Sequence, residues 1–137
     1  MKRAVNLSLE ETGMIEIKII DREHRADINI PNRPFRLFGR MIPAYTNEMW
    51  SYTIEKFENE TQMCFPDENY DYDAMIGNST FIGAYDHDAC IGLAIMQSGF
   101  FKYVYLYDLK VNPEYRNQGV AKLLIDKAGE LAFVIGL

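Results

Sequence analysis

The chain has 137 residues and a mass of 15.9 kDa, which fits one domain of ordinary size. Hydrophobic residues make up 48% and charged residues 25%, a globular composition that excludes disorder, a collagen-like chain and a small disulfide scaffold. Fourteen Lys and Arg against twenty Asp and Glu leave a formal net charge of −6. This charge argues against general nucleic-acid binding, which needs a basic face, and favours a cationic small-molecule substrate.

Neither a membrane nor a metal partner is expected from the sequence. The longest apolar runs, such as residues 89–96, are far too short to cross a bilayer, which takes about 20 residues. No continuous apolar segment follows Lys2 and Arg3, so no signal peptide is predicted. Cys64 and Cys90 lie in unlike contexts without metal-ligand spacing. We interpret them as reduced thiols of a cytoplasmic protein that has no metal site.

The first half of the chain predicts few regular elements. Residues 1–13 are polar and are interpreted as a poorly ordered leader. From residue 14 to 20, isoleucines alternate with charged residues, which predicts a strand with one buried face. Residues 35–42 are predicted as a short helix ended by Pro43, and residues 51–57 as one or two helical turns, because Trp50, Ile54 and Phe57 have i, i+4, i+7 spacing. The acidic, tyrosine-rich residues 64–73 are predicted as a loop.

The second half carries stronger patterns. Residues 80–85 and 90–97, separated by a polar turn, predict an antiparallel hairpin. Aromatic and β-branched residues dominate positions 102–111, which predicts a further strand ended by Pro113. Apolar residues at helical spacing predict an amphipathic helix over residues 119–133. The predicted order is therefore several strands and then a last strand that leads into a helix. This order indicates a single α+β, or mixed α/β, domain over residues 1–137.

The junction between the last strand and this helix is a candidate anion site. The first backbone N–H groups of a helix have no partners inside it, and the helix dipole adds positive potential there. Gly119 has no Cβ and Ala121 has only a methyl group, so a phosphate could approach the amides of residues 117–122. Arg116 and Lys122 add charge nearby. The alternative interpretation is an ordinary capped helix start.

The same junction resembles a known family signature. The Arg-x-x-Gly-x-Ala pattern of residues 116–121 resembles the acyl-coenzyme A signature of the GNAT superfamily of N-acetyltransferases, Gln/Arg-x-x-Gly-x-Gly/Ala. Its context, Asp-Leu-x-Val before it, then Pro and Tyr-Arg, and Leu-Leu after it, matches too. Residues 34–43 and 50–53 are similar to the N-terminal half of streptothricin acetyltransferases. The resemblance covers most of the chain from about Met14 onward.

The resemblance implies a GNAT-like acyl-CoA N-acyltransferase fold, an antiparallel sheet flanked by helices. The activity it implies is transfer of an acetyl group to a primary amine of a small molecule, and the narrower likeness suggests a streptothricin-like substrate. The cosubstrate it implies is acetyl-CoA. Its pyrophosphate would lie on the loop at the helix start, and its pantetheine arm would pair with the backbone of the preceding strand. The residues that would bind it are Leu109, Lys110, Val111, Arg116, Asn117, Gln118, Gly119, Val120, Ala121 and Lys122.

The proposed chemistry needs a base, because an alkyl ammonium with a pKa of ~10.4 has no free lone pair at neutral pH. A backbone N–H must also stabilise the charge that develops on the thioester oxygen. Asp108 and the strand tyrosines Tyr105 and Tyr107 are the candidates for base or relay. A structural role for Asp108, in which it accepts from a backbone amide in a turn or bulge, stays open.

A complete fold of this family continues after the coenzyme helix with a fifth strand, a fourth helix and usually two further strands, whereas this chain ends at Leu137. The resemblance therefore implies a partial domain that lacks its C-terminal strands and is catalytically impaired unless another chain supplies them. One alternative is a non-catalytic CoA-binding remnant that forms a homodimer through an exposed strand edge. Another is a mononucleotide-binding module, which the absence of a Walker-type Lys-Ser/Thr disfavours. The acidic run at residues 67–73 is either a solvated loop or a holder for a polycationic amine.

Overall fold

The computed structural model describes residues 15–134. The expected leader, residues 1–13, lies outside this range. The described elements follow the order β1 (Glu16–Ile19), the 3₁₀ helix η1 (Arg22–Asn29), β2 (Phe35–Thr46), β3 (Met49–Met63), α2 (Tyr72–Met75), β4 (Ser79–Asp86), β5 (Ala89–Ser98), β6 (Val104–Val111), the 3₁₀ helix η2 (Pro113–Tyr115) and α3 (Val120–Val134). They divide into two compact units, and residues 32–66 form the smaller one.

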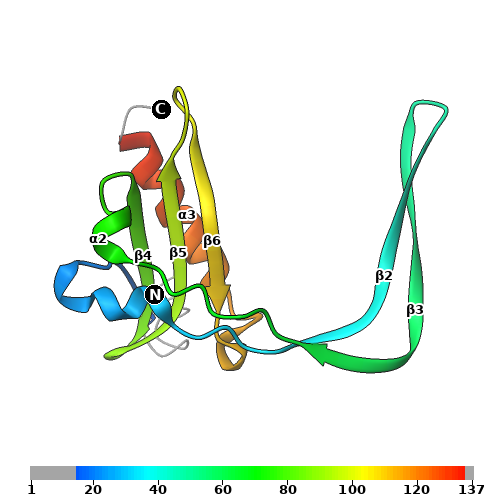
Figure 1. Ribbon diagram of the computed structural model, residues 1–137, viewed down its shortest axis with the longest axis horizontal. Coiled ribbons are helices and arrows are strands. Elements are labelled where there is room, and N and C mark those ends of the chain that lie inside the picture. The colour runs from blue at the N-terminus through cyan, green and yellow to red at the C-terminus, as the bar shows by residue number, and fades with distance from the viewer. Residues whose placement is uncertain (1–14, 135–137) are drawn as a thin grey trace, which may run out of the picture. The chain divides into compact units, whose positions relative to one another are not determined.

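The larger unit is built on a four-stranded antiparallel sheet with the strand order β1-β4-β5-β6 (Figure 1). The strand predicted within residues 14–20, the hairpin, the strand before Pro113 and the C-terminal helix are all present, with ends that differ from the prediction by at most two residues. β6 stands at one edge of the sheet. Its outer backbone groups therefore have no strand beside them among residues 15–134.

Both faces of this sheet are covered, because the strand side chains alternate between two cores. On one face, Ile82 of β4 and Ala94 of β5 pack with Val120 and Leu124 of α3. On the other face, strand residues pack against η1 and α2, and the buried members of this second core are Ile20, Ile28, Tyr72, Phe81, Tyr85, Leu93 and Ile95. The result is a mixed α/β layer structure in which α3 lies against one side of the sheet (Figure 1).

The smaller unit contradicts the helices predicted over residues 35–42 and 51–57, because it is a long two-stranded hairpin of β2 and β3. Its turn consists of Asn47 and Glu48, which have φ angles of 52° and 61°, the combination that a two-residue type I′ turn requires. Trp50 and Ile54, which have helical spacing, are also an even number of residues apart. Together with Tyr52 they satisfy the two-residue period of a strand equally well.

Pro43, which was expected to end a helix, lies inside β2 opposite Tyr52. In a hairpin closed by a two-residue turn, hydrogen-bonded and non-hydrogen-bonded pairs alternate from the turn outward. The Pro43–Tyr52 pair falls at a non-hydrogen-bonded position, where the N–H that proline lacks would point away from the partner strand. Proline is therefore tolerated at this position.

Among residues 15–134, no helix is long and apolar enough to span a membrane.

Candidate functional site

The loop between β6 and α3 leaves the first amides of α3 open. After η2, the chain passes through Asn117 and Gly119, whose φ angles are 61° and 86°, and α3 then begins at Val120. Gly119 suits this position because residues with a side chain rarely adopt such a φ angle. A Cβ built on Gly119 would meet no atom within 4 Å. No described side chain fills the space beside this glycine, as an anion site requires.

A cavity of about 340 Å³ adjoins this loop and brings together most of the residues predicted to bind the cosubstrate. Its lining residues are Val111, Tyr115, Arg116, Asn117, Gly119, Val120, Ala121 and Lys122. We call it the loop cavity. Tyr115 is the one lining residue that the sequence did not single out as a ligand. Its hydroxyl donates to the carboxylate of Asp86, which raises the pKa of Tyr115 and lowers that of Asp86.

Two cations flank the loop cavity. Arg116 donates from Nε to the carbonyl oxygen of Val111 at 3.0 Å, so the end of β6 orients its guanidinium. Lys122 forms an ion pair with Asp126 one turn along α3, with 2.7 Å between Nζ and Oδ2, and its side chain is 78% exposed. An exposed pair of this kind contributes little to stability, so the ammonium can turn to another anion at small cost.

The remaining predicted ligands, Leu109, Lys110 and Gln118, do not line the loop cavity. Gln118 donates from Nε2 to the carbonyl oxygen of Glu114 at 3.0 Å. The Lys110 ammonium lies 2.9 Å from Oε1 of Glu68 and 3.4 Å from the carbonyl oxygen of Ile30. The side chain of Lys110 thus belongs to another cluster. Only its backbone suits the role that the family resemblance implies.

That other cluster surrounds Asp108, the candidate base. The hydroxyl of Tyr70 donates to Oδ2 of Asp108 at 2.8 Å, and the ammonium of Lys110 lies 3.8 Å from the same oxygen. The side chain of Asp108 is 19% exposed. Burial, followed by the bond to Asp108, raises the pKa of Tyr70 well above its ordinary value, so the phenol stays protonated and remains a donor. The sequence contains Tyr70 only as part of an acidic run, and nothing local to it signals this partnership.

Tyr107, the second catalytic candidate, is the extra residue of a β-bulge. In the register between β5 and β6, Ile95 faces Asp108 and Met96 faces Leu106, so Tyr107 has no partner residue. Its side chain is about half exposed, and its ring centroid lies 6.2 Å from that of Tyr70. Bulges leave one peptide unit out of the ladder and are frequent beside active sites. The sequence has no glycine or proline here that would have predicted the bulge.

Carboxylates of the acidic run have structural partners. Glu68 pairs with Lys110, Asp73 pairs with Arg22, and Asp71 caps α2 by accepting from the amide of Ala74 at 3.2 Å. The prediction of a loop holds for residues 64–71, whereas α2 begins at Tyr72. The negative charge around the run is therefore smaller than the sequence suggests.

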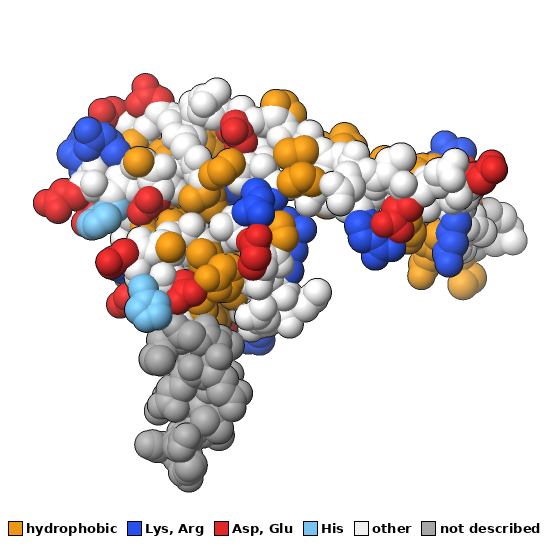
Figure 2. Space-filling model, turned by 90° about the horizontal axis from the view of Figure 1, so that it is seen from below, with side chains coloured by type: hydrophobic (Ala, Val, Ile, Leu, Met, Phe, Trp, Pro, Cys, Tyr) orange, Lys and Arg blue, Asp and Glu red, His pale blue; other side chains and the backbone are white. Residues whose placement is uncertain are grey.

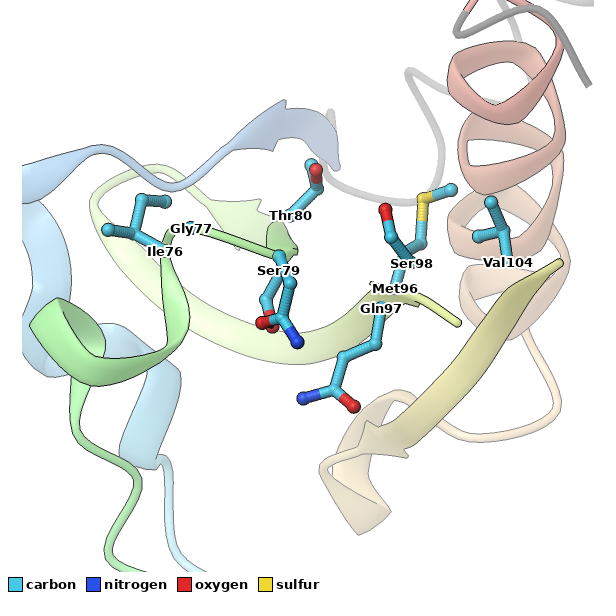
Figure 3. A pocket seen from close by; sticks show the side chains of 9 residues that line it. Ile76, Gly77, Ser79, Thr80, Met96, Gln97, Ser98 and Val104 are labelled. Carbon is cyan, nitrogen blue, oxygen red and sulfur yellow. Dashed lines mark hydrogen bonds between the residues drawn. The ribbon is translucent and has the colours of Figure 1, made fainter. Parts of the chain in front are cut away.

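A second hollow lies where β4 begins and β5 ends, next to the start of β6 and therefore at the far end of that strand from the loop cavity (Figure 3). Its polar groups come from Asn78, Ser79, Thr80, Gln97 and Ser98, and it contains no titratable side chain. It cannot supply an acid or a base. Within residues 15–134, no group of three or more His, Cys, Asp or Glu side chains is arranged to hold a metal ion.

Comparison with known proteins agrees with this geometry. The model of the acetyltransferase (GNAT) family matches residues 46–137. Streptothricin acetyltransferase A of Bacillus subtilis (strain 168) is 38% identical over 108 residues, which cover 77% of this chain and 62% of that protein. The chain thus spans less than two thirds of the length of this curated relative.

Two solved structures share the fold. One is a protein from Bacillus anthracis str. Ames assigned as a streptothricin acetyltransferase, in complex with acetyl coenzyme A, with a TM-score of 0.71 and 22% identity over 86% of this chain and 68% of that one. The other is nourseothricin acetyltransferase, with a TM-score of 0.68 and 20% identity over 89% of this chain and 68% of that one. The predicted α+β fold class is confirmed.

Proposed function

The chain belongs to the acetyltransferase (GNAT) family, and from that premise we propose that it transfers an acetyl group from acetyl-CoA to a primary amine of a small molecule. The observation that carries the proposal is the open start of α3. The amides from Asn117 to Lys122 and the guanidinium of Arg116 would hold the pyrophosphate of the cosubstrate. A long side chain at position 119 would occupy space that the pyrophosphate needs.

The backbone of β6 would hold the pantetheine arm. β6 is the edge strand of the sheet, so its outer N–H and C=O groups are available to an extended ligand. The stretch from Leu109 to Val111 leads directly into the loop cavity, where Val111 is a lining residue. One continuous surface would therefore serve both the arm and the pyrophosphate.

Asp108 would take a proton from the substrate ammonium, and the neutral amine would then attack the thioester carbon and displace CoA as the thiolate. Asp108 lies three residues before Val111 in β6, and its carboxylate accepts a hydrogen bond from the hydroxyl of Tyr70. Tyr70 is unsuited to act as the base itself because of its raised pKa. The peptide N–H of Tyr107, which the bulge leaves without a partner residue, is the candidate donor to the thioester oxygen.

The substrate class is proposed as a polycationic amine of the streptothricin type. The support is the 38% identity to a streptothricin acetyltransferase and the net charge of −6. A third cavity, on the η1 and α2 side of Tyr70, offers the aromatic faces of Tyr70 and Tyr72 and the carboxylates of Asp71 and Asp73 near Asp108, although Arg25 also lines it. Because Asp71 also caps α2, Tyr70 is the better residue to test. In Tyr70→Phe the aromatic face remains, while the hydrogen bond to Asp108 is lost.

A second candidate function is CoA binding without transfer. It would need only the open start of α3 and the outer edge of β6, with no proton transfer through Asp108. The expected cytoplasmic location stays part of the proposal. It is supported by the two cysteines, which are both free thiols.

Titration calorimetry and a thiol-release assay separate these functions. We expect CoA to bind and ATP to bind more weakly, and we expect thiol release with streptothricin or a polyamine. Asp108→Asn keeps an oxygen acceptor for Tyr70, so it should leave CoA affinity unchanged and lower kcat by about 10²–10⁴. CoA binding without any turnover would favour the second function. Absence of binding heat with CoA would refute both.

A further inference from the structure

The β2–β3 hairpin has two unlike sides, which the helices predicted over residues 35–42 and 51–57 did not anticipate. Residues that face each other across the two strands share a side of the ribbon, and successive residues alternate between sides. One side therefore carries six large apolar residues in three facing pairs, Met41 with Ile54, Pro43 with Tyr52, and Tyr45 with Trp50. We call this side the aromatic face. Over the same stretch the other side has no aromatic residue: it carries Ala44, Ser51, Thr53 and the ion pair between Arg40 and Glu55, with Ile42 and Met49 as its two large apolar residues.

The aromatic face is open over its whole length. Trp50 is 74% exposed, Tyr52 63%, and Met41 and Tyr45 59% each. The rings of Tyr45 and Trp50 lie against each other, with centroids 4.9 Å apart. Figure 2 shows apolar side chains exposed along the hairpin beside side chains of both charges. A contiguous apolar patch of this kind marks an interaction surface, and an isolated two-stranded ribbon is at best marginally stable in water.

We propose that the aromatic face binds the aromatic face of a second copy of this chain, so that two hairpins stack about a two-fold axis. The inference is independent of the proposed catalytic function.

The area of the face matches this occupant. With about 150–250 Å² for each aromatic side chain, the observed exposures leave roughly 600 Å² of apolar surface on one hairpin. Two hairpins would together bury about 1,200 Å², which reaches the lower end of the size of specific protein interfaces.

The charges of the hairpin are also self-complementary. Residues 32–66 contain four Lys and Arg and four Glu, so this unit has no net charge, although the whole chain carries −6. Glu48 stands in the turn at one end of the aromatic face, and Lys56 lies on that face at the other end. Within residues 15–134 neither has an ion-pair partner. An antiparallel stack about a two-fold axis near the Pro43–Tyr52 pair would bring Glu48 of each copy toward the partner's Lys56.

Two copies are expected to associate by stacking their aromatic faces rather than by pairing the edges of their β2 strands. Pro43 removes one outward N–H from the middle of β2, which blunts that edge as a template for another strand. The ribbon is therefore less suited to extending a sheet than to stacking.

The test uses the full chain, in which Trp50 is the only tryptophan. Sedimentation velocity over a range of concentrations should find a dimer, and the Trp50 emission should shift to the red on dilution as the indole becomes exposed. Tyr52→Glu, on the aromatic face, should raise the dimer Kd on the order of 30-fold, as loss of an interface aromatic does. The matched control is Thr53→Glu, which adds the same charge on the opposite face of the same strand and should leave Kd unchanged.

A charge exchange keeps the test decisive if Tyr52→Glu disturbs the hairpin. Glu48→Lys and Lys56→Glu should each weaken the dimer, and the double variant should restore it. A wild-type monomer, an open-ended assembly, equal effects of Tyr52→Glu and Thr53→Glu, or a double variant no better than its parents would overturn the proposal. A monomer with blue-shifted Trp50 emission at every concentration would instead assign the face to this chain's own larger unit.

Discussion

Replacing Gly119 by alanine tests the proposed cosubstrate site with a single methyl group. The new Cβ would meet no atom within 4 Å, so steric contact with the protein contributes nothing. The whole effect comes from the φ angle of 86°, which alanine adopts only at a cost of about 1–2 kcal/mol. Either the variant is destabilised by this amount, or its loop relaxes to a negative φ angle and the amides that begin α3 turn away from the loop cavity.

Gly129 provides the matched control. It lies inside α3, and a Cβ built there also meets no atom within 4 Å, but its backbone is helical. Gly129→Ala should stabilise the protein by about 1 kcal/mol through helix propensity. The two substitutions add the same methyl group and should change stability in opposite directions. In a domain of this size, each should move Tm by roughly 3–5 °C.

Calorimetric titration with CoA then separates stability from binding. Gly119→Ala should weaken CoA binding about tenfold or more, because several amide contacts to the pyrophosphate depend on the loop conformation. Gly129→Ala should leave the affinity unchanged. Equal CoA affinities for the two variants would refute the reasoning that the amides around Gly119 bind the cosubstrate.

Three further substitutions or treatments test the fold. Leu124→Ala should destabilise the protein by about 2–5 kcal/mol in a denaturant titration, because Leu124 is fully buried between α3 and the sheet, and a loss below 1 kcal/mol would contradict that packing. At concentrations well below the dimer Kd, Glu48→Gly should stabilise the hairpin by roughly 1 kcal/mol, since Glu48 has a φ angle of 61°, and a lower Tm of the monomer would speak against the type I′ turn. Burial raises the pKa of the Cys90 thiol to about 11, so iodoacetamide at pH 8 should label the exposed Cys64 and spare Cys90, as peptide mass spectrometry can measure. Equal labelling would show that Cys90 is accessible.

Local sequence patterns predicted the four strands and the C-terminal helix of the larger unit and the candidate anion site at the start of α3, but neither η1 nor α2. Short apolar runs bounded by polar turns mark β4 and β5, aromatic and β-branched residues mark β6, and α3 has a helical period, so local pattern was sufficient for these elements. The spacing of Arg116, Gly119 and Ala121 is also local, and the structure brings most of the predicted ligands to one cavity. These features depend on residues that are close in the chain.

Features that depend on residues far apart in the chain could not be predicted from local patterns. Trp50 and Ile54 fit both a helix and a strand, and only their pairing with β2 selected the strand. Tyr70 reaches Asp108 across 38 positions, and Lys110 reaches Glu68 across 42. The bulge at Tyr107 is a mismatch between two strands, so neither strand alone encodes it. A sequence pattern reports the period of one element, whereas register, ion pairs and hydrogen bonds are set by which elements meet.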